Sequence, residues 1–139
     1  MNQLASDLKR LLTHPDPPVS VTYDMAHDLW IAKTPLGHSV RLSEAGWHEK
    51  IQRSHPEFAS NMQYIQEIRN ALEDPDFVVK GWEGELLSLR WCAIAPNAPK
   101  YICVVYRAAA PVGFVITAFF ISRYGKLLRR GIQWQKTRT

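Results

Sequence analysis

The chain has 139 residues, of which 46% are hydrophobic and 22% are charged, and its formal net charge is +4. This length predicts one domain with a sizeable core, and the composition is typical of a soluble globular protein. The longest apolar stretch, 108–121, is too short to span a membrane and is broken by Pro111 and Gly113. The N-terminus lacks a charged head before an apolar run, so we predict no signal peptide and a cytoplasmic protein.

The chain contains two cysteines, Cys92 and Cys103, in neighbouring apolar segments. Neither has a partner at a metal-ligand spacing, and the five histidines are not clustered in a zinc pattern either. We therefore predict two small buried thiols in a reducing compartment, with no metal and no cofactor.

The first segment shows leucines at helical spacing and then a proline-rich break. Leu4, Leu8 and Leu11 predict an amphipathic helix over 2–13. The run His-Pro-Asp-Pro-Pro at 14–18 ends this helix, because proline cannot continue a helix and restricts the residue before it. We expect an N-terminal helix and linker over 1–18, followed by a single domain over 19–139.

The domain begins with short alternating segments and continues with two helical patterns. Short strands are predicted over 19–23, 29–33 and 39–42. Ser43 is a suitable N-cap for a helix over 44–54, and Pro56 suits the first turn of a second helix. The apolar stripe of that second helix consists of Phe58, Met62, Ile65, Ile68, Ala71 and Leu72.

The remainder of the chain is predicted to form strands joined by short links. They are expected over 77–80, 86–94, 101–107 and 112–122, with a last strand around 132–134. Such a series favours an antiparallel meander. The predicted fold class is therefore α+β, with N-terminal helices packed on an antiparallel sheet.

Positive charge is concentrated in the last quarter of the chain. Residues 107–139 contain no Asp or Glu, and their basic residues are Arg107, Arg123, Lys126, Arg129, Arg130, Lys136 and Arg138. This asymmetry favours contact with nucleic acid or with an acidic protein.

Three motifs in a fixed order resemble a known group of nucleases. They are W-H-E-K-I-Q-R-S-H-P-E at 47–57, L-E-D-P-D-F-V at 72–78 and G-F-V-I-T-A-F-F at 113–120. This order is similar to that of the phage- and mobile-element-associated nuclease families of the BECR fold, which groups barnase-, EndoU-, colicin- and RelE-like ribonucleases. The resemblance covers about 40–134 and leaves the N-terminal helix outside.

The resemblance implies a barnase-like fold and a metal-independent endoribonuclease that acts as a toxin or as a phage or mobile-element effector. RNA, including tRNA, is the implied partner. For a toxin, a cognate inhibitor protein is also implied.

Metal-independent cleavage of RNA uses the 2′-hydroxyl as nucleophile and needs a base, an acid and a cation for the phosphate. His48 and His55 are the candidate proton-transfer pair. They share one helix face but would lie about 10 Å apart, so they need not act together unless the chain bends before Pro56. Glu57 is a further candidate base, although a carboxylate in a first helical turn is also explained by the helix dipole.

Thr117 is the polar residue of an apolar strand, and alternation predicts that Val115, Thr117 and Phe119 share one face. Its hydroxyl requires a partner, which leaves two interpretations: a donor at the active site, or a hydrogen bond to a neighbour. Arg107 or Lys126 is the predicted phosphate cation.

The basic C-terminal part is the predicted RNA-binding surface. Its candidate residues are Arg123, Arg129, Arg130 and Trp134, since bases stack on aromatic rings. The other tryptophans, Trp30, Trp47, Trp82 and Trp91, are interpreted as packing residues. Two alternatives remain: a non-catalytic RNA- or protein-binding module on the same fold, and a phage structural accessory domain.

Overall fold

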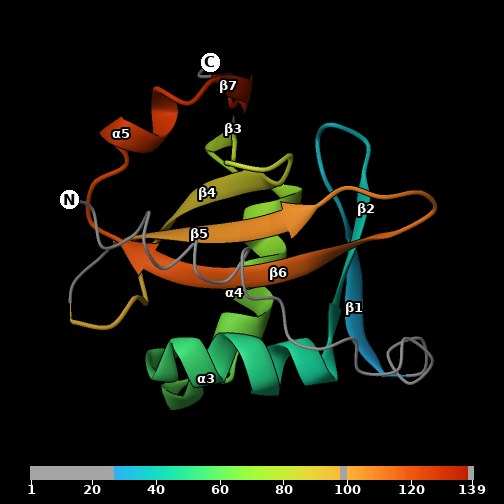
Figure 1. The fold of residues 1–139 in the computed structure, drawn as a ribbon. Coiled ribbons are helices and arrows are strands. Elements are labelled where there is room, and N and C mark those ends of the chain that lie inside the picture. The colour runs from blue at the N-terminus through green and yellow to red at the C-terminus, as the bar shows by residue number, and fades with distance from the viewer. Residues whose placement is uncertain (1–26, 98–99, 138–139) are drawn as a thin grey trace.

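The computed structural model describes residues 27–97 and 100–137, so the helix expected over 2–13, the linker at 14–18 and the strand expected over 19–23 lie outside the described residues. Seven strands form one sheet in the order β1-β2-β6-β5-β4-β3-β7 (Figure 1). The strands are β1 (Asp28–Lys33), β2 (Ser39–Ser43), β3 (Phe77–Lys80), β4 (Leu86–Cys92), β5 (Lys100–Arg107), β6 (Gly113–Ile121) and β7 (Ile132–Gln135). The helical segments are η1 (Gly46–Ile51), α3 (Gln52–Ser54), η2 (Pro56–Ser60), α4 (Gln63–Glu73) and α5 (Gly125–Leu128).

The α+β class is confirmed, but the sheet is mixed and not purely antiparallel. The predicted meander exists: β3, β4, β5 and β6 are successive antiparallel neighbours. However, β2 lies parallel to β6, with Val40 opposite Gly113 and Arg41 opposite Phe114. A parallel neighbour requires a long crossover, and here the chain between β2 and β6 includes η1, α3, η2, α4 and three strands. Within residues 27–97 and 100–137, every helix therefore lies between strands and none precedes the sheet.

One face of the sheet, called the helix face here, carries the larger core. The helix over η1 and α3 lies along β6, and α4 crosses behind the sheet (Figure 1). The buried helix-face residues include Trp30, Val40, Leu42, Trp47, Ile51, Phe58, Ile68, Leu72, Ile102, Val104, Tyr106, Val115 and Ala118. Ser43 caps the helical segment that follows it, as predicted, because its Oγ accepts a 2.9 Å hydrogen bond from the Gly46 N–H.

The second helix is not continuous from Pro56. A 3₁₀ turn, η2, is followed by Asn61 in extended conformation with φ −153° and ψ 117°. Asn61 Oδ1 then accepts a 2.9 Å hydrogen bond from the Gln63 N–H, which starts α4. Because the break changes the helical phase, Met62 is 67% exposed and its prediction as a core residue is wrong.

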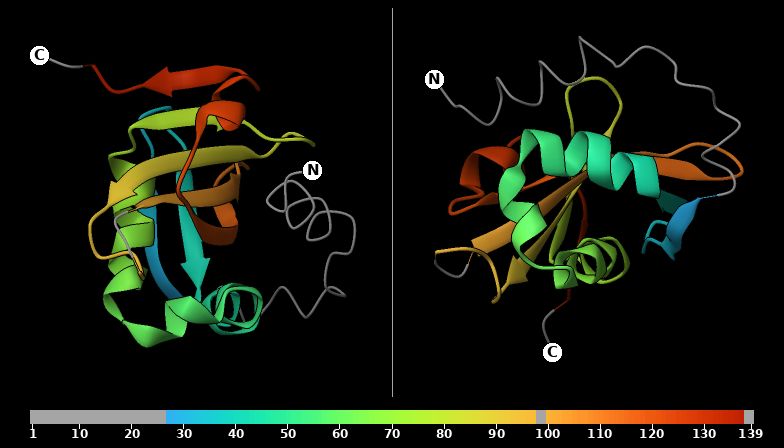
Figure 2. Two further views of the ribbon diagram at one scale, coloured as in Figure 1. Left: turned by 90° about the vertical axis from the view of Figure 1, so that its left-hand side faces the viewer. Right: turned by 90° about the horizontal axis from the view of Figure 1, so that it is seen from below.

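The opposite face of the sheet, called the second face here, is partly covered by α5, so α4 and α5 lie on opposite sides (Figure 2). Its buried residues are Val79, Leu87, Leu89, Cys103, Val105, Phe119, Ile121 and Leu127. A register shift in the β5–β6 pair makes Val105 oppose Thr117 while Tyr106 opposes Val115. This bulge breaks the alternation predicted for β6. Val115 therefore joins the helix face, whereas Thr117 stays beside Val105 on the second face.

None of the helices within residues 27–97 and 100–137 is long and apolar enough to cross a bilayer.

Candidate functional site

His55 is the candidate histidine that contacts the sheet. It follows α3 with φ −136° and ψ 79°, a conformation outside the α region that suits a residue before proline. Its ring lies 5.9 Å from the Phe119 ring, and its Nδ1 is 3.9 Å from Glu57 Oε2. The side chain is only 15% exposed. The helix break at Pro56 thus brings an imidazole and a carboxylate to the end of β6.

His48 is placed differently. It lies in η1, is exposed, and its Nδ1 forms a 3.0 Å hydrogen bond with Gln52 Oε1 on the next turn of its own helix. The two histidines predicted as a pair therefore occupy different environments. His55 packs against β6, whereas His48 faces solvent.

Thr117 shares the second face with Phe119, two residues further along β6. At the usual rise of a strand, the Cα atoms of these two residues are about 7 Å apart. Thr117 is fully buried, and its Oγ1 has no hydrogen-bond partner among the described residues. The β6 site, defined here as His55, Glu57, Thr117 and Phe119, therefore combines three candidates from the sequence with Phe119, the residue of β6 that His55 contacts.

The structure separates Arg107 from the β6 site. Arg107 ends β5 opposite Phe114, five residues and roughly 15 Å along β6 from Phe119. Its Nη1 donates a 3.1 Å hydrogen bond to the Glu83 carbonyl, and its Nη2 is 3.7 Å from Glu85 Oε2. Arg107 is thus held in an ion pair with the β3–β4 loop.

Glu85 is the buried charge that the sequence predictions missed. It is 1% exposed, and its carboxylate accepts hydrogen bonds from the backbone N–H groups of Trp82 and Glu83. The available signal was the spacing Gly81-Trp82-Glu83-Gly84-Glu85, where Gly84 has φ +88° and Gly81 leaves room for the carboxylate. A buried carboxylate with two N–H donors and an arginine organises this turn.

Arg130, one of the predicted RNA-binding residues, holds the C-terminal segment to the same turn. Its Nη2 donates a 2.7 Å hydrogen bond to the Gly81 carbonyl, and its Nε donates a 3.2 Å bond to the Lys80 carbonyl. Its guanidinium carbon is 4.0 Å from the centre of the Trp82 ring. This cation–π contact and the two hydrogen bonds give Arg130 a structural role.

The other basic and aromatic candidates lie within or beside two elements, α5 and β7. Arg123, Lys126 and Arg129 are exposed within or beside α5, and within the described residues they form no ion pair. Arg123 is only four residues beyond Phe119. Trp134 is half-buried in β7, opposite Val78 and at the far edge of the sheet from β6.

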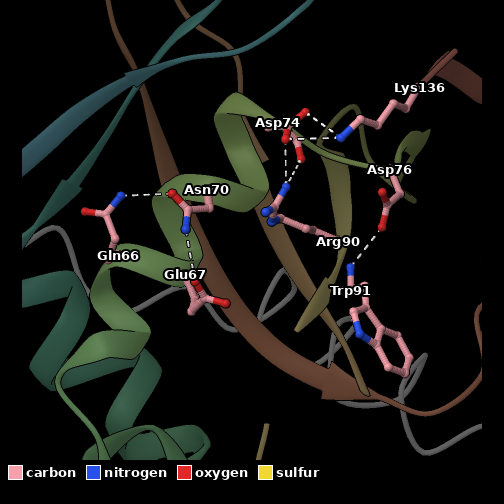
Figure 3. Close-up of polar contacts among 8 residues, drawn as sticks. All are labelled: Gln66, Glu67, Asn70, Asp74, Asp76, Arg90, Trp91 and Lys136. Carbon is pink, nitrogen blue, oxygen red and sulfur yellow. Dashed lines mark hydrogen bonds and ion pairs between the residues drawn. The ribbon is translucent and has the colours of Figure 1, made fainter. Parts of the chain in front are cut away.

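The acidic residues of the motif at 72–78 are held in a separate polar network (Figure 3). Asp74 Oδ2 accepts a 2.8 Å hydrogen bond from Arg90 Nη1, and Asp74 Oδ1 is 3.1 Å from Lys136 Nζ. Asp76 Oδ2 accepts a 2.9 Å bond from the Trp91 N–H. The hydrogen bond from Lys136 lowers the pKa of Asp74 most, and the hydrogen bond from Arg90 lowers it further. These contacts join the end of α4 to β4 and β7.

Both cysteines are free and buried, as predicted. Burial, together with the Sγ–H to Glu67 Oε1 hydrogen bond of 3.3 Å, raises the pKa of Cys92 to about 12. Burial also raises the pKa of Cys103. A thiol with a raised pKa is a poor nucleophile at neutral pH. In the part of the chain that the structure describes, no group of three His, Cys, Asp or Glu side chains is arranged to hold a metal ion.

No protein-family model, no curated protein and no solved structure matches the chain.

Proposed function

We propose that the chain is a metal-independent endoribonuclease in which His55 transfers the proton. The observation that carries the proposal is the position of His55 at the end of β6, where its ring contacts Phe119 and its Nδ1 is 3.9 Å from Glu57 Oε2. A carboxylate beside an imidazole orients the ring and stabilises the imidazolium that forms when histidine takes a proton. An imidazole held in this way is suited to act on the 2′-hydroxyl of RNA.

The remaining roles go to residues around the β6 site. Arg123 and Lys126 are the proposed phosphate cations, because both are exposed and follow directly after β6. Thr117 is proposed to support the site, since its hydroxyl is buried on the same face without a partner among the described residues. In this proposal Arg107 acts through the β3–β4 turn and does not contact the phosphate.

The proposal includes the finer fold and partner predictions. The helix along β6 and the antiparallel meander are compatible with a barnase-like arrangement. The proposed substrate is RNA, including tRNA. If the activity is toxic, an inhibitor protein with an acidic surface would complement the basic residues after β6.

The test compares RNA cleavage by three proteins in EDTA. Purified wild-type chain is incubated with total RNA and with tRNA, beside His55→Ala and the matched control His48→Ala. We expect the wild type and His48→Ala to cleave at similar rates and His55→Ala to be about 100-fold slower or worse, the usual range for loss of a general acid or base. Products should end in a 2′,3′-cyclic phosphate.

Three outcomes contradict the proposal. The first is absence of cleavage by the wild type, and the second is equal cleavage by wild type and His55→Ala, which indicates a contaminating nuclease. The third is cleavage that requires a divalent metal ion. RNA binding without cleavage would favour the non-catalytic RNA-binding module in place of the enzyme.

A further inference from the structure

Four aromatic side chains form a continuous row on the second face. The Trp91 and Tyr101 ring centres are 5.3 Å apart, and those of Tyr101 and Tyr124 are 4.5 Å apart, both in edge-to-face geometry. Phe77 continues the row, with its ring centre 5.4 Å from that of Tyr124. We call these four residues the aromatic row.

Trp91 is the exposed end of the aromatic row. The sequence predicted that Trp91 is a core or edge packing residue. Its ring does pack on Tyr101, but the residue is 49% exposed, so much of the ring remains open. Large aromatic rings bury much apolar area when covered, and a half-exposed tryptophan at the end of an aromatic row offers a stacking surface.

The aromatic row lies at the same end of the sheet as the β6 site. Trp91 opposes Tyr101 across β4 and β5, and Tyr101 opposes Ile121 across β5 and β6. Phe119, which contacts His55, is two residues before Ile121. With neighbouring strands about 4.8 Å apart, Trp91 lies roughly 10 Å across the sheet from the end of β6. In Figure 1 these strand ends and the end of α3 lie on one side of the molecule.

The charge around the aromatic row suits a polyanion. Arg123 and Lys126 flank Tyr124 in sequence and are exposed. On the Trp91 side, the Asp76 carboxylate accepts a hydrogen bond from the Trp91 N–H, and Asp74 is paired with Arg90. Aromatic rings interleaved with cations are the usual surface for single-stranded nucleic acid, because each base stacks while the backbone meets positive charge.

We propose that the aromatic row binds an unpaired base next to the phosphate at the β6 site, which makes single-stranded RNA, or the loop of a folded RNA, the substrate class. This inference rests on the proposed ribonuclease function and specifies its substrate. In a duplex both faces of each base are covered by neighbouring bases, so a paired base cannot stack on Trp91. A flexible loop can present its bases to the ring.

The test measures binding separately from cleavage. The probe is a fluorescein-labelled 12-nucleotide 2′-O-methyl RNA, which cannot be cleaved by 2′-hydroxyl attack, either single-stranded or annealed to its complement. Binding to the full chain is followed by fluorescence anisotropy for wild type, Trp91→Ala and Trp91→Phe. Phe114→Ala is the matched control, because Phe114 is a 44% exposed aromatic residue at the other end of β6.

We expect the wild type to bind the single strand at least about 10-fold more tightly than the duplex. Trp91→Ala should lose about 10-fold to 100-fold in affinity for the single strand, the usual contribution of one stacked base. Trp91→Phe should recover most of this loss, and Phe114→Ala should bind like wild type. Thermal unfolding of each variant checks that the fold is retained.

The inference is overturned if Trp91→Ala binds the single strand like wild type, if the duplex binds as tightly, or if the wild type binds neither probe. The cleavage assay distinguishes the two proposals. If the wild type cleaves RNA but Trp91→Ala binds the single strand as tightly as the wild type, the ribonuclease proposal stands and the aromatic row is rejected. If binding depends on Trp91 but the chain does not cleave RNA, the aromatic row stands as a binding surface and the enzyme is rejected.

Discussion

Asp74 shows how a single residue of a predicted motif acquires a structural role. Its carboxylate receives Arg90 from β4 and Lys136 from the segment after β7, residues 16 and 62 positions away in sequence. These ion pairs connect parts of the chain that no local pattern relates (Figure 3). Because the Asp74 side chain is 55% exposed, solvent screens both pairs and their contribution to stability is modest.

The lowered pKa of Asp74 predicts a pH-dependent contribution to folding. A carboxyl whose folded pKa lies below its unfolded value, about 3.9, stabilises the fold above that value and loses this effect as pH falls through the folded pKa. We expect Asp74→Asn to lower the free energy of unfolding by about 0.5–1 kcal/mol at pH 7. The difference from wild type should shrink below pH 4, as measured by urea denaturation at pH 7, 5 and 3.

Lys136→Met serves as the partner variant for Asp74. In a double-mutant cycle at pH 7, Asp74→Asn and Lys136→Met should be less than additive, since each removes the same ion pair. A loss for Asp74→Asn that is equal at pH 3 and pH 7 would contradict the electrostatic explanation.

At the scale of elements, the β3–β4 hairpin is organised by charge as well as by its strands. The Glu85 carboxylate fills the turn, Arg107 pairs with it from β5, and Arg130 holds the turn from beyond α5. Two distant segments thus converge on one loop. Removing one partner would leave a buried charge or unsatisfied backbone groups, which costs more than the contact itself contributes.

Gly81→Ala tests this organisation. A Cβ at residue 81 would overlap the Glu85 carboxylate, so that side chain must leave its N–H donors. We expect a loss of about 1–3 kcal/mol in the free energy of unfolding, the usual cost of an unsatisfied buried polar group. Chemical denaturation monitored by circular dichroism measures this loss.

Gly125→Ala is the control for Gly81→Ala. A Cβ at Gly125 in α5 meets nothing within 4 Å, so this change should be neutral or slightly stabilising in the helix. Equal losses for the two variants would show that the Glu85 carboxylate does not determine the effect.

At the scale of the whole molecule, aromatic packing joins the helical layer to the sheet. Phe58 in η2 is fully buried, and its ring stacks on Phe120 of β6 with centres 4.6 Å apart. Edge-to-face contacts connect it to Trp47 at 6.1 Å and to Tyr64 at 5.5 Å. The same η2 turn follows His55, so this cluster also fixes the position of the β6 site.

Phe58→Ala should therefore reduce the stability of the fold and, with it, the proposed cleavage of RNA. We expect a loss of about 3–5 kcal/mol in the free energy of unfolding, as for other buried Phe residues replaced by Ala. Met62→Ala, a change at a 67% exposed residue four positions later, should alter it by less than about 0.5 kcal/mol. Thermal and urea unfolding of both variants provide the comparison, and similar losses would show that Phe58 is not a core residue.

The predictions from sequence succeeded where the signal was local. The alternation around β3, β4 and β5 located those strands within two residues, and Ser43 marked the helix start through its own hydroxyl. The predictions failed where a distant contact decided the outcome. Met62 left the helical phase because of the break at Asn61, and Val115 changed face because of the bulge opposite Val105 and Tyr106.

The candidate site shows the same division. The sequence indicated that His48, His55, Thr117 and a cation were the residues to consider. The distances between them depend on tertiary structure: His55 contacts Phe119, and Thr117 lies two residues before Phe119 in β6. His48 faces solvent, and Arg107 lies at the other end of β6.

By itself, the sequence determined the α+β class, the antiparallel meander and the basic C-terminal part, because hydrophobic periodicity and charge act over a few residues. Only the tertiary structure decided that β2 pairs parallel with β6, that Arg107 and Arg130 are held by the β3–β4 turn, and that Trp91 stays half-exposed beside Tyr101. These outcomes depend on pairing and burial between residues far apart in the chain, whose energies no local window contains.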